Sequence, residues 1–109
     1  MIGVVEMVFK ALAAQPRRQL LDELFREDGQ TLSALERRLP MTRFGVMKHL
    51  RVLEEAGLVT TRRRGREKLH FLNPVPLQQI YDRWIRKFER SRLKAMADLK
   101  RRLEGTHDG

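Results

Sequence analysis

The chain has 109 residues, which fits one domain with a modest hydrophobic core. It contains no cysteine, so disulfides and thiolate metal sites are excluded. Its 23 Lys and Arg against 14 Asp and Glu give a formal net charge of +9. Glu6 interrupts the apolar N-terminal stretch and no apolar run is long enough to cross a membrane, so we expect a cytoplasmic protein without a signal peptide.

The positive charge is concentrated in the middle of the chain. Residues 31–72 hold ten Lys and Arg against four Asp and Glu, whereas residues 1–30 hold four against five. This distribution predicts that the middle of the chain binds a polyanion such as nucleic acid. The alternative is a basic, well-solvated surface without a nucleic-acid partner, and charge alone does not separate the two.

The first part of the chain is predicted to form three helices. Residues 3–14 are apolar on nearly every side, so a helix there must be covered on more than one face. Residues 16–28 follow, with Pro16 at the favoured first helical position and apolar residues at helical spacing. Residues 31–39 form the third helix, capped by Thr31. The apolar stripe of the second helix consists of Leu20, Leu21, Leu24 and Phe25.

A fourth helix follows after a tight turn. Thr42 is a capping residue, residues 43–56 carry an apolar stripe at Val46, Leu50 and Leu53, and Gly57 is the expected left-handed terminator. Two short amphipathic helices joined by so short a turn are typical of a helix-turn-helix.

The pattern then changes to that of a β-hairpin followed by a long helix. Residues 58–61 and 68–72 have strand character, and the basic run between them contains Gly65, which favours a turn. Residues 73–76 break the hairpin, and residues 77–103 are predicted to form one long helix. We therefore expect a mainly α winged helix-turn-helix domain with a small β-hairpin, in the order α-α-α-α-β-β-α. It spans residues 1–104, and residues 105–109 are expected to be a disordered tail.

The fourth helix is the predicted recognition helix, because such helices meet base edges with their N-terminal residues. Arg43 can pair with guanine, Phe44 and Met47 can contact thymine methyl groups, and Thr42 can bind a phosphate. The alternatives are an ordinary solvated helix and, for the arginines of the hairpin, a solubilising loop. The predicted DNA-binding residues are Thr42, Arg43, Phe44, Met47, Lys48, His49, Arg51, Arg62, Arg63, Arg64 and Arg66.

The first and last helices carry more apolar surface than one small domain can cover, which predicts a homodimer. The residues that we expect in the interface are Val5, Val8, Phe9, Leu12, Ile80, Trp84, Ile85 and Phe88. The sequence contains no catalytic constellation and no His or Asp set with metal-ligand spacing. We expect no enzyme activity, no cofactor and no metal.

The stretch from Val8 to Pro74 resembles the ArsR/SmtB family of bacterial winged-helix repressors. Its most specific parts are residues 48–59, KHLRVLEEAGLV, and the turn from Arg63 to Arg66. The resemblance implies homodimers built from the first and last helices, a fourth helix that reads the major groove, and repression of a promoter by occupying it. Many members sense metals through cysteines on the third helix or Asp/His sets on the last one, and neither set occurs here, so the resemblance does not extend to metal sensing.

Two functions are compatible with these features. The first is a repressor that binds a palindromic duplex operator as a homodimer in the cytoplasm, associated with the nucleoid. The second is an adaptor whose long last helix binds a protein partner, with non-specific nucleic-acid contacts from the basic surface. The exposed aromatic and methionine side chains of the fourth helix favour the first function. The effector signal, if there is one, is not indicated by the sequence.

Overall fold

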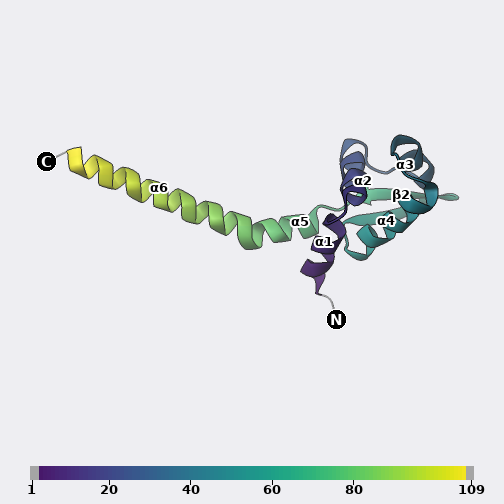
Figure 1. Cartoon of the computed structure of the whole chain (residues 1–109), viewed down its shortest axis with the longest axis horizontal. Coiled ribbons are helices and arrows are strands. Elements are labelled where there is room, and N and C mark those ends of the chain that lie inside the picture. The colour runs from purple at the N-terminus through teal and green to yellow at the C-terminus, as the bar shows by residue number, and fades with distance from the viewer. Residues whose placement is uncertain (1–2, 108–109) are drawn as a thin grey trace. The chain divides into compact units, whose positions relative to one another are not determined.

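The computed structural model describes residues 3–107 and confirms the winged helix-turn-helix fold in the expected order of elements (Figure 1). The chain divides into the units Met1–Leu77 and Gln78–Gly109. The first, called the head below, holds α1 (Val4–Leu12), α2 (Gln15–Arg26), α3 (Leu32–Arg38), α4 (Arg43–Glu55), β1 (Val59–Arg64) and β2 (Glu67–Leu72). After these come α5 (Val75–Ile80), the π-helical turn η1 (Tyr81–Ile85) and α6 (Arg86–His107).

The core of the head is built from the apolar stripes that the sequence predicts. Leu35 of α3 is fully buried, as are two residues of α2 and two of α4, and α1 packs against both α2 and α4. The buried side chains include Leu20, Leu24, Val46, Leu50, Leu53 and Leu58. This packing fixes which side of α4 faces outward.

Two apolar residues are not where the sequence pattern put them. Phe25 is 82% exposed, because it lies at the edge of the α2 stripe and near the end of that helix. Val8, expected in a dimer interface, is 1% exposed and belongs to the core of its own subunit. The prediction for Val8 is wrong because this residue is buried within the head, where α1 packs against α2 and α4.

The predicted helix ends are confirmed by their hydrogen bonds. The hydroxyl oxygen of Thr31 accepts from the Ala34 N–H at 3.1 Å, and that of Thr42 accepts from the Gly45 N–H at 3.0 Å. Each bond satisfies a backbone donor that the first helical turn leaves unpaired. Gly57 has φ +76° where α4 ends, a conformation that glycine adopts without steric cost.

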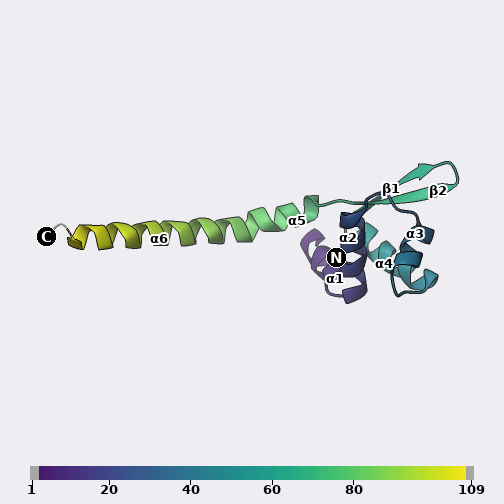
Figure 2. The ribbon, with the colours of Figure 1, turned by 90° about the horizontal axis from the view of Figure 1, so that it is seen from above.

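The hairpin is longer than expected. Its antiparallel register runs from Val59 opposite Leu72 to Arg64 opposite Glu67, so the turn consists of Gly65 and Arg66. Gly65 has φ +64°, as the tight turn requires. Figure 2 shows this end of the hairpin projecting beyond the helices of the head. Residues 62–64, expected in a loop, are strand residues, because their backbone groups pair with β2.

The C-terminal segment, which consists of α5, η1 and α6, stays helical beyond the point where the sequence predicts the end of the last helix. α6 continues to His107, so residues 105–107 form helix where a disordered tail was expected, and residues 108–109 lie outside the described residues. The expected single helix contains the π-helical turn η1, which no sequence signal predicted. Among the described residues, no helix is long and apolar enough to span a membrane.

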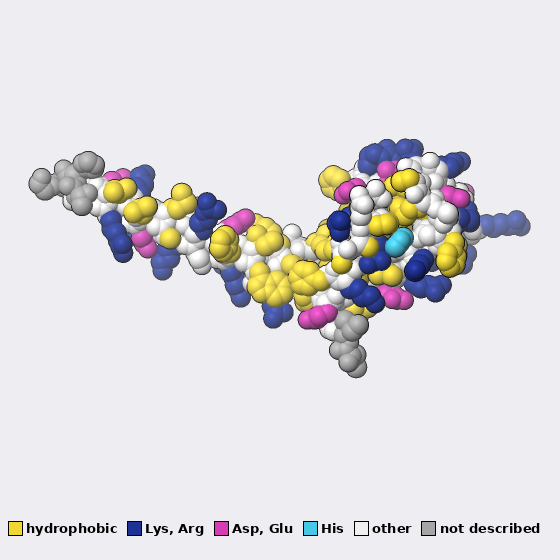
Figure 3. All heavy atoms as spheres, in the orientation of Figure 1, with side chains coloured by type: hydrophobic (Ala, Val, Ile, Leu, Met, Phe, Trp, Pro, Cys, Tyr) yellow, Lys and Arg dark blue, Asp and Glu magenta, His cyan; other side chains and the backbone are white. Residues whose placement is uncertain are grey.

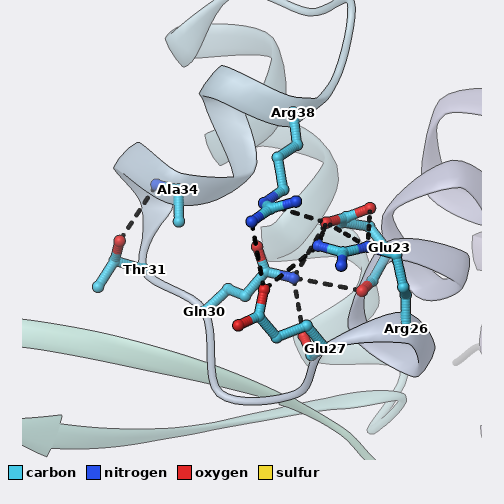
Figure 4. Close-up of polar contacts among 7 residues, drawn as sticks. All are labelled: Glu23, Arg26, Glu27, Gln30, Thr31, Ala34 and Arg38. Atoms are coloured by element: carbon cyan, nitrogen blue, oxygen red, sulfur yellow. Dashed lines mark hydrogen bonds and ion pairs between the residues drawn. The ribbon is translucent and has the colours of Figure 1, made fainter.

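Gln30 connects α2 to the hairpin and is 5% exposed. Its backbone forms an isolated bridge with His70, whose N–H donates to the Gln30 carbonyl oxygen at 2.9 Å. Its side-chain Nε2 donates to the Glu27 carbonyl oxygen at 2.7 Å and to that of Glu23 at 3.2 Å (Figure 4). Gln30 therefore caps the end of α2 and anchors β2 at the same time.

We predict that Gln30→Ala lowers the free energy of unfolding by about 1–3 kcal/mol, because two partly buried hydrogen bonds to carbonyl groups at the end of α2 are lost. Urea denaturation monitored by circular dichroism measures the change. Gln79→Ala, at an exposed position, is the control and should be neutral. An equal stability for the two variants would contradict the anchoring role of Gln30.

Candidate nucleic-acid interface

A groove of about 510 Å³ lies between α3, α4 and the hairpin. It is lined by residues from all three elements, among them Met47 on the outward side of α4. Five of the lining side chains are basic and two, Glu54 and Glu67, are acidic. The basic side chains are Arg37, Arg43, Arg51, Arg66 and Lys68. Such a surface attracts a polyanion.

The outward face of α4 combines this charge with apolar side chains. Phe44 is 75% exposed and Met47 is 48% exposed, beside Arg43 at the start of the helix. Exposed apolar side chains next to arginines suit a partner that offers both anionic and apolar groups. Duplex DNA does so, since its major groove presents thymine methyl groups beside the phosphates.

Thr42 and Gly45 act together at the start of α4. The Thr42 oxygen accepts from the Gly45 N–H, and its hydroxyl hydrogen can still be donated outward. A Cβ atom at position 45 would lie 3.2 Å from this oxygen, which is closer than an ordinary contact. Glycine at position 45 therefore leaves room for the cap that begins the predicted recognition helix.

His49 is half-buried and faces the head rather than the groove. Its Nδ1 lies 3.3 Å from Nη1 of Arg17, whose Nε donates to the Ala11 carbonyl oxygen at 2.7 Å. Burial lowers the pKa of His49, and the nearby charges of Arg17 and Lys48 lower it further. The sequence grouped His49 with the DNA-binding residues. In the structure its contact with Arg17 ties α4 to the start of α2, and Arg17 in turn binds the end of α1.

The arginines of the hairpin are divided between its two faces. Residues that pair across the strands share a face, so Arg63 and Lys68 lie on the same face as the buried Val59 and His70. Arg62 and Arg64 lie on the opposite face. There the Arg62 guanidinium lies 5.8 Å from the centre of the Phe71 ring, and Arg64 pairs with Glu67 at 3.3 Å.

Sequence reasoning missed two basic residues of the groove, Arg37 and Lys68. Lys68 pairs with Glu54 of α4 at 3.3 Å, which links the hairpin to the helix. The strand alternation of Lys68 with His70 was the available signal, since both lie on the face turned toward the helices. Arg37 gave no comparable signal, because a basic residue at the end of a helix is common.

The long C-terminal helix exposes apolar side chains among basic ones. In Figure 3, yellow hydrophobic side chains lie between dark blue Lys and Arg side chains along α6, and dark blue side chains are also numerous on the head. Four large apolar residues of α6 beyond Phe88 are more than half exposed, namely Leu93, Met96, Leu99 and Leu103. No group of His, Cys, Asp or Glu among the described residues is arranged to hold a metal ion.

Comparison with known proteins agrees with this geometry. A helix-turn-helix domain model matches residues 9–62, which covers α2, α3, α4 and parts of the neighbouring elements. An uncharacterised HTH-type transcriptional regulator of Bacillus subtilis (strain 168) is 41% identical over 91 residues, which cover 78% of this chain and 99% of the relative. An ArsR-like transcriptional regulator from Rhodococcus sp. RHA1 has the same fold with a TM-score of 0.72 and 31% identity. The chain belongs to the ArsR-like family of winged helix-turn-helix transcriptional regulators.

The likeness to this family extends over most of the chain. The Rhodococcus structure is matched over 94% of this chain and 92% of its own length. The cadmium metal-sensor CMTR of Mycobacterium tuberculosis is 30% identical, with a TM-score of 0.53 over 61% of this chain and 67% of its own. As a member of this family the chain is a DNA-binding transcriptional regulator, as the sequence predicted.

Proposed function

We propose that this ArsR-like regulator is a repressor that binds a palindromic operator in duplex DNA as a homodimer. The observation that carries the proposal is the outward face of α4, where exposed Phe44 and Met47 lie beside Arg43 at the edge of a basic groove. Repression then follows from occupancy of the operator. The protein works in the cytoplasm, on the nucleoid, and needs no metal.

The basic residues have two separate tasks in this proposal. Arg43, Phe44 and Met47 meet base edges and carry the sequence preference. Phosphate contacts fix the position of the protein on the duplex and supply most of the salt-dependent affinity. They come from Thr42, Lys48, Arg51 and the hairpin residues Arg63, Arg66 and Lys68.

The dimer is supported by apolar surface that water would otherwise cover. On α1, Val4 is 68% exposed and Phe9 is 50% exposed. In the C-terminal segment, Ile85 and Phe88 are 45% and 67% exposed. We propose that this surface is covered by a second copy of the chain, because a homodimer pairs the same surface patch on both subunits. The proposed interface contains Val5, Phe9, Leu12, Ile80, Trp84, Ile85 and Phe88.

The exposed apolar residues of α6 also suit the second candidate, an adaptor that binds another protein through this helix. The salt dependence of binding separates the two functions. A repressor binds one duplex sequence far more tightly than other duplexes at physiological salt. An adaptor with non-specific nucleic-acid contacts binds duplex DNA and single-stranded RNA alike, and both weaken together as salt rises.

The main test compares Arg43→Ala with Lys48→Ala on duplexes selected from a randomised pool. Arg43→Ala should cost about 1–3 kcal/mol and relax the preference at one operator position, because a base contact is lost. Lys48→Ala should weaken binding to all duplexes and reduce the salt slope by about 1, because a phosphate contact is lost. Equal, sequence-independent losses in both variants would contradict the assignment.

The two faces of the hairpin give a second test with a matched control. Arg63→Ala with Arg66→Ala should weaken binding to every duplex and reduce the salt slope by about 2, since both side chains contact phosphates in the proposed complex. Arg62→Ala with Arg64→Ala removes the same charge from residues that already contact Phe71 and Glu67. If this control pair weakens binding as much, the hairpin acts only through its total charge.

The dimer is tested at two residues that are equally exposed in one chain, Phe88 at 67% and Leu93 at 66%. Phe88→Ala should weaken the dimer by about 2 kcal/mol or more, because a buried aromatic at an interface is a typical hot spot. Leu93 lies on a different side of α6, so Leu93→Ala should change little. Analytical ultracentrifugation measures both, and a wild-type chain that stays monomeric at micromolar concentration while binding one operator tightly would overturn the dimer.

A further inference from the structure

The guanidinium of Arg43 is tied to α3. Arg43 is the first residue of α4, directly after the Thr42 cap. Its Nη1 lies 3.3 Å from Oε2 of Glu36 and also donates to Oγ of Ser33 at 3.3 Å. Ser33 and Glu36 are one helical turn apart on α3, so they approach Arg43 from the same side.

These contacts leave one edge of the guanidinium open. Both are made by Nη1, and no described residue accepts a hydrogen bond from Nε or Nη2 of Arg43. The N–H groups of Nε and Nη2 point in parallel from a planar group, which is the arrangement that donates to O6 and N7 of guanine. If the Arg43 side chain rotated away from Glu36, its guanidinium group would present a different edge to the base.

The ion pair between Arg43 and Glu36 contributes little to the stability of the fold. Its side chains are 54% exposed for Arg43 and 37% exposed for Glu36, and pairs of this kind contribute little to folding. A carboxylate beside the groove also repels phosphates, so Glu36 lowers the affinity for every duplex. Glu36 can, however, orient Arg43, and a long side chain that is already ordered loses less conformational freedom on binding.

We propose that Glu36 is a positioning residue: it holds Nη1 of Arg43 so that the Nε and Nη2 edge meets a guanine, and it sets a base preference without touching DNA. This inference rests on the proposed function, in which Arg43 contacts a base. Ser33 supports the same nitrogen from the same helix.

Four variants of the chain separate orientation from charge. Glu36→Ala removes both the acceptor and the charge, whereas Glu36→Gln removes the charge and keeps an oxygen acceptor. Glu55→Ala removes a carboxylate from the last turn of α4, where it makes no ion pair with any described residue. Ser33→Ala removes the other acceptor of Nη1 and gives a second measure of orientation, and circular dichroism checks that each variant is folded.

The quantity to measure is a ratio of two dissociation constants. The numerator is the constant for a duplex changed at the base pair where Arg43→Ala loses preference, and the denominator is the constant for the unchanged duplex that the wild type selects from a randomised pool. Glu36→Ala should reduce this ratio by about threefold to tenfold, since part of a bidentate base contact is lost. Glu36→Gln should stay within about twofold of the wild type, and Glu55→Ala should change both constants equally. With Arg43→Ala already present, Glu36→Ala should change the ratio no further.

The outcomes distinguish this inference from the proposed function. A selective wild type whose ratio is unchanged by Glu36→Ala and by Ser33→Ala overturns the positioning role alone. A ratio that falls as far in Glu36→Gln as in Glu36→Ala also overturns it, because charge then explains the effect. A wild type that selects no sequence overturns the proposed function and this inference together.

Discussion

The orientation of α4 is the constraint on which the interface depends. Val46, Leu50 and Leu53 are buried in the core of the head, so α4 cannot rotate without exposing them. Burying each such side chain is worth about 1.5–3 kcal/mol, which is large beside any single surface contact. The opposite side of the helix therefore faces outward, and Phe44 and Met47 are exposed although their side chains are apolar.

The hairpin is held to the helices of the head by polar contacts as well as by the buried Val59 of β1. The backbone bridge between Gln30 and His70 fixes β2 against the end of α2, and Lys68 pairs with Glu54 of α4. Directional hydrogen bonds, such as those of the Gln30–His70 bridge, add one specific arrangement to this packing. The groove thus gains a fixed shape, although many of its charged side chains are exposed.

The acidic residues near the groove have a shared physical consequence. Glu36, Glu54 and Glu67 each pair with a basic residue of the head, namely Arg43, Lys68 and Arg64. A DNA phosphate must compete with these carboxylates, which reduces binding to arbitrary sequences more than the net charge of the chain implies. Sequence preference then comes from contacts that reward the correct bases, and Arg43 held by Glu36 is the sharpest candidate for one.

The sequence by itself determined the order of elements, the caps at Thr31 and Thr42 and the turn at Gly65, because caps, glycine turns and helical periodicity depend on neighbouring residues. It also singled out the outward residues of α4. Tertiary structure alone decided that Val8 is buried, that the hairpin arginines divide between two faces, and that Glu36 holds Arg43. These features join residues that are distant in sequence or depend on pairing register, and no local pattern encodes such contacts.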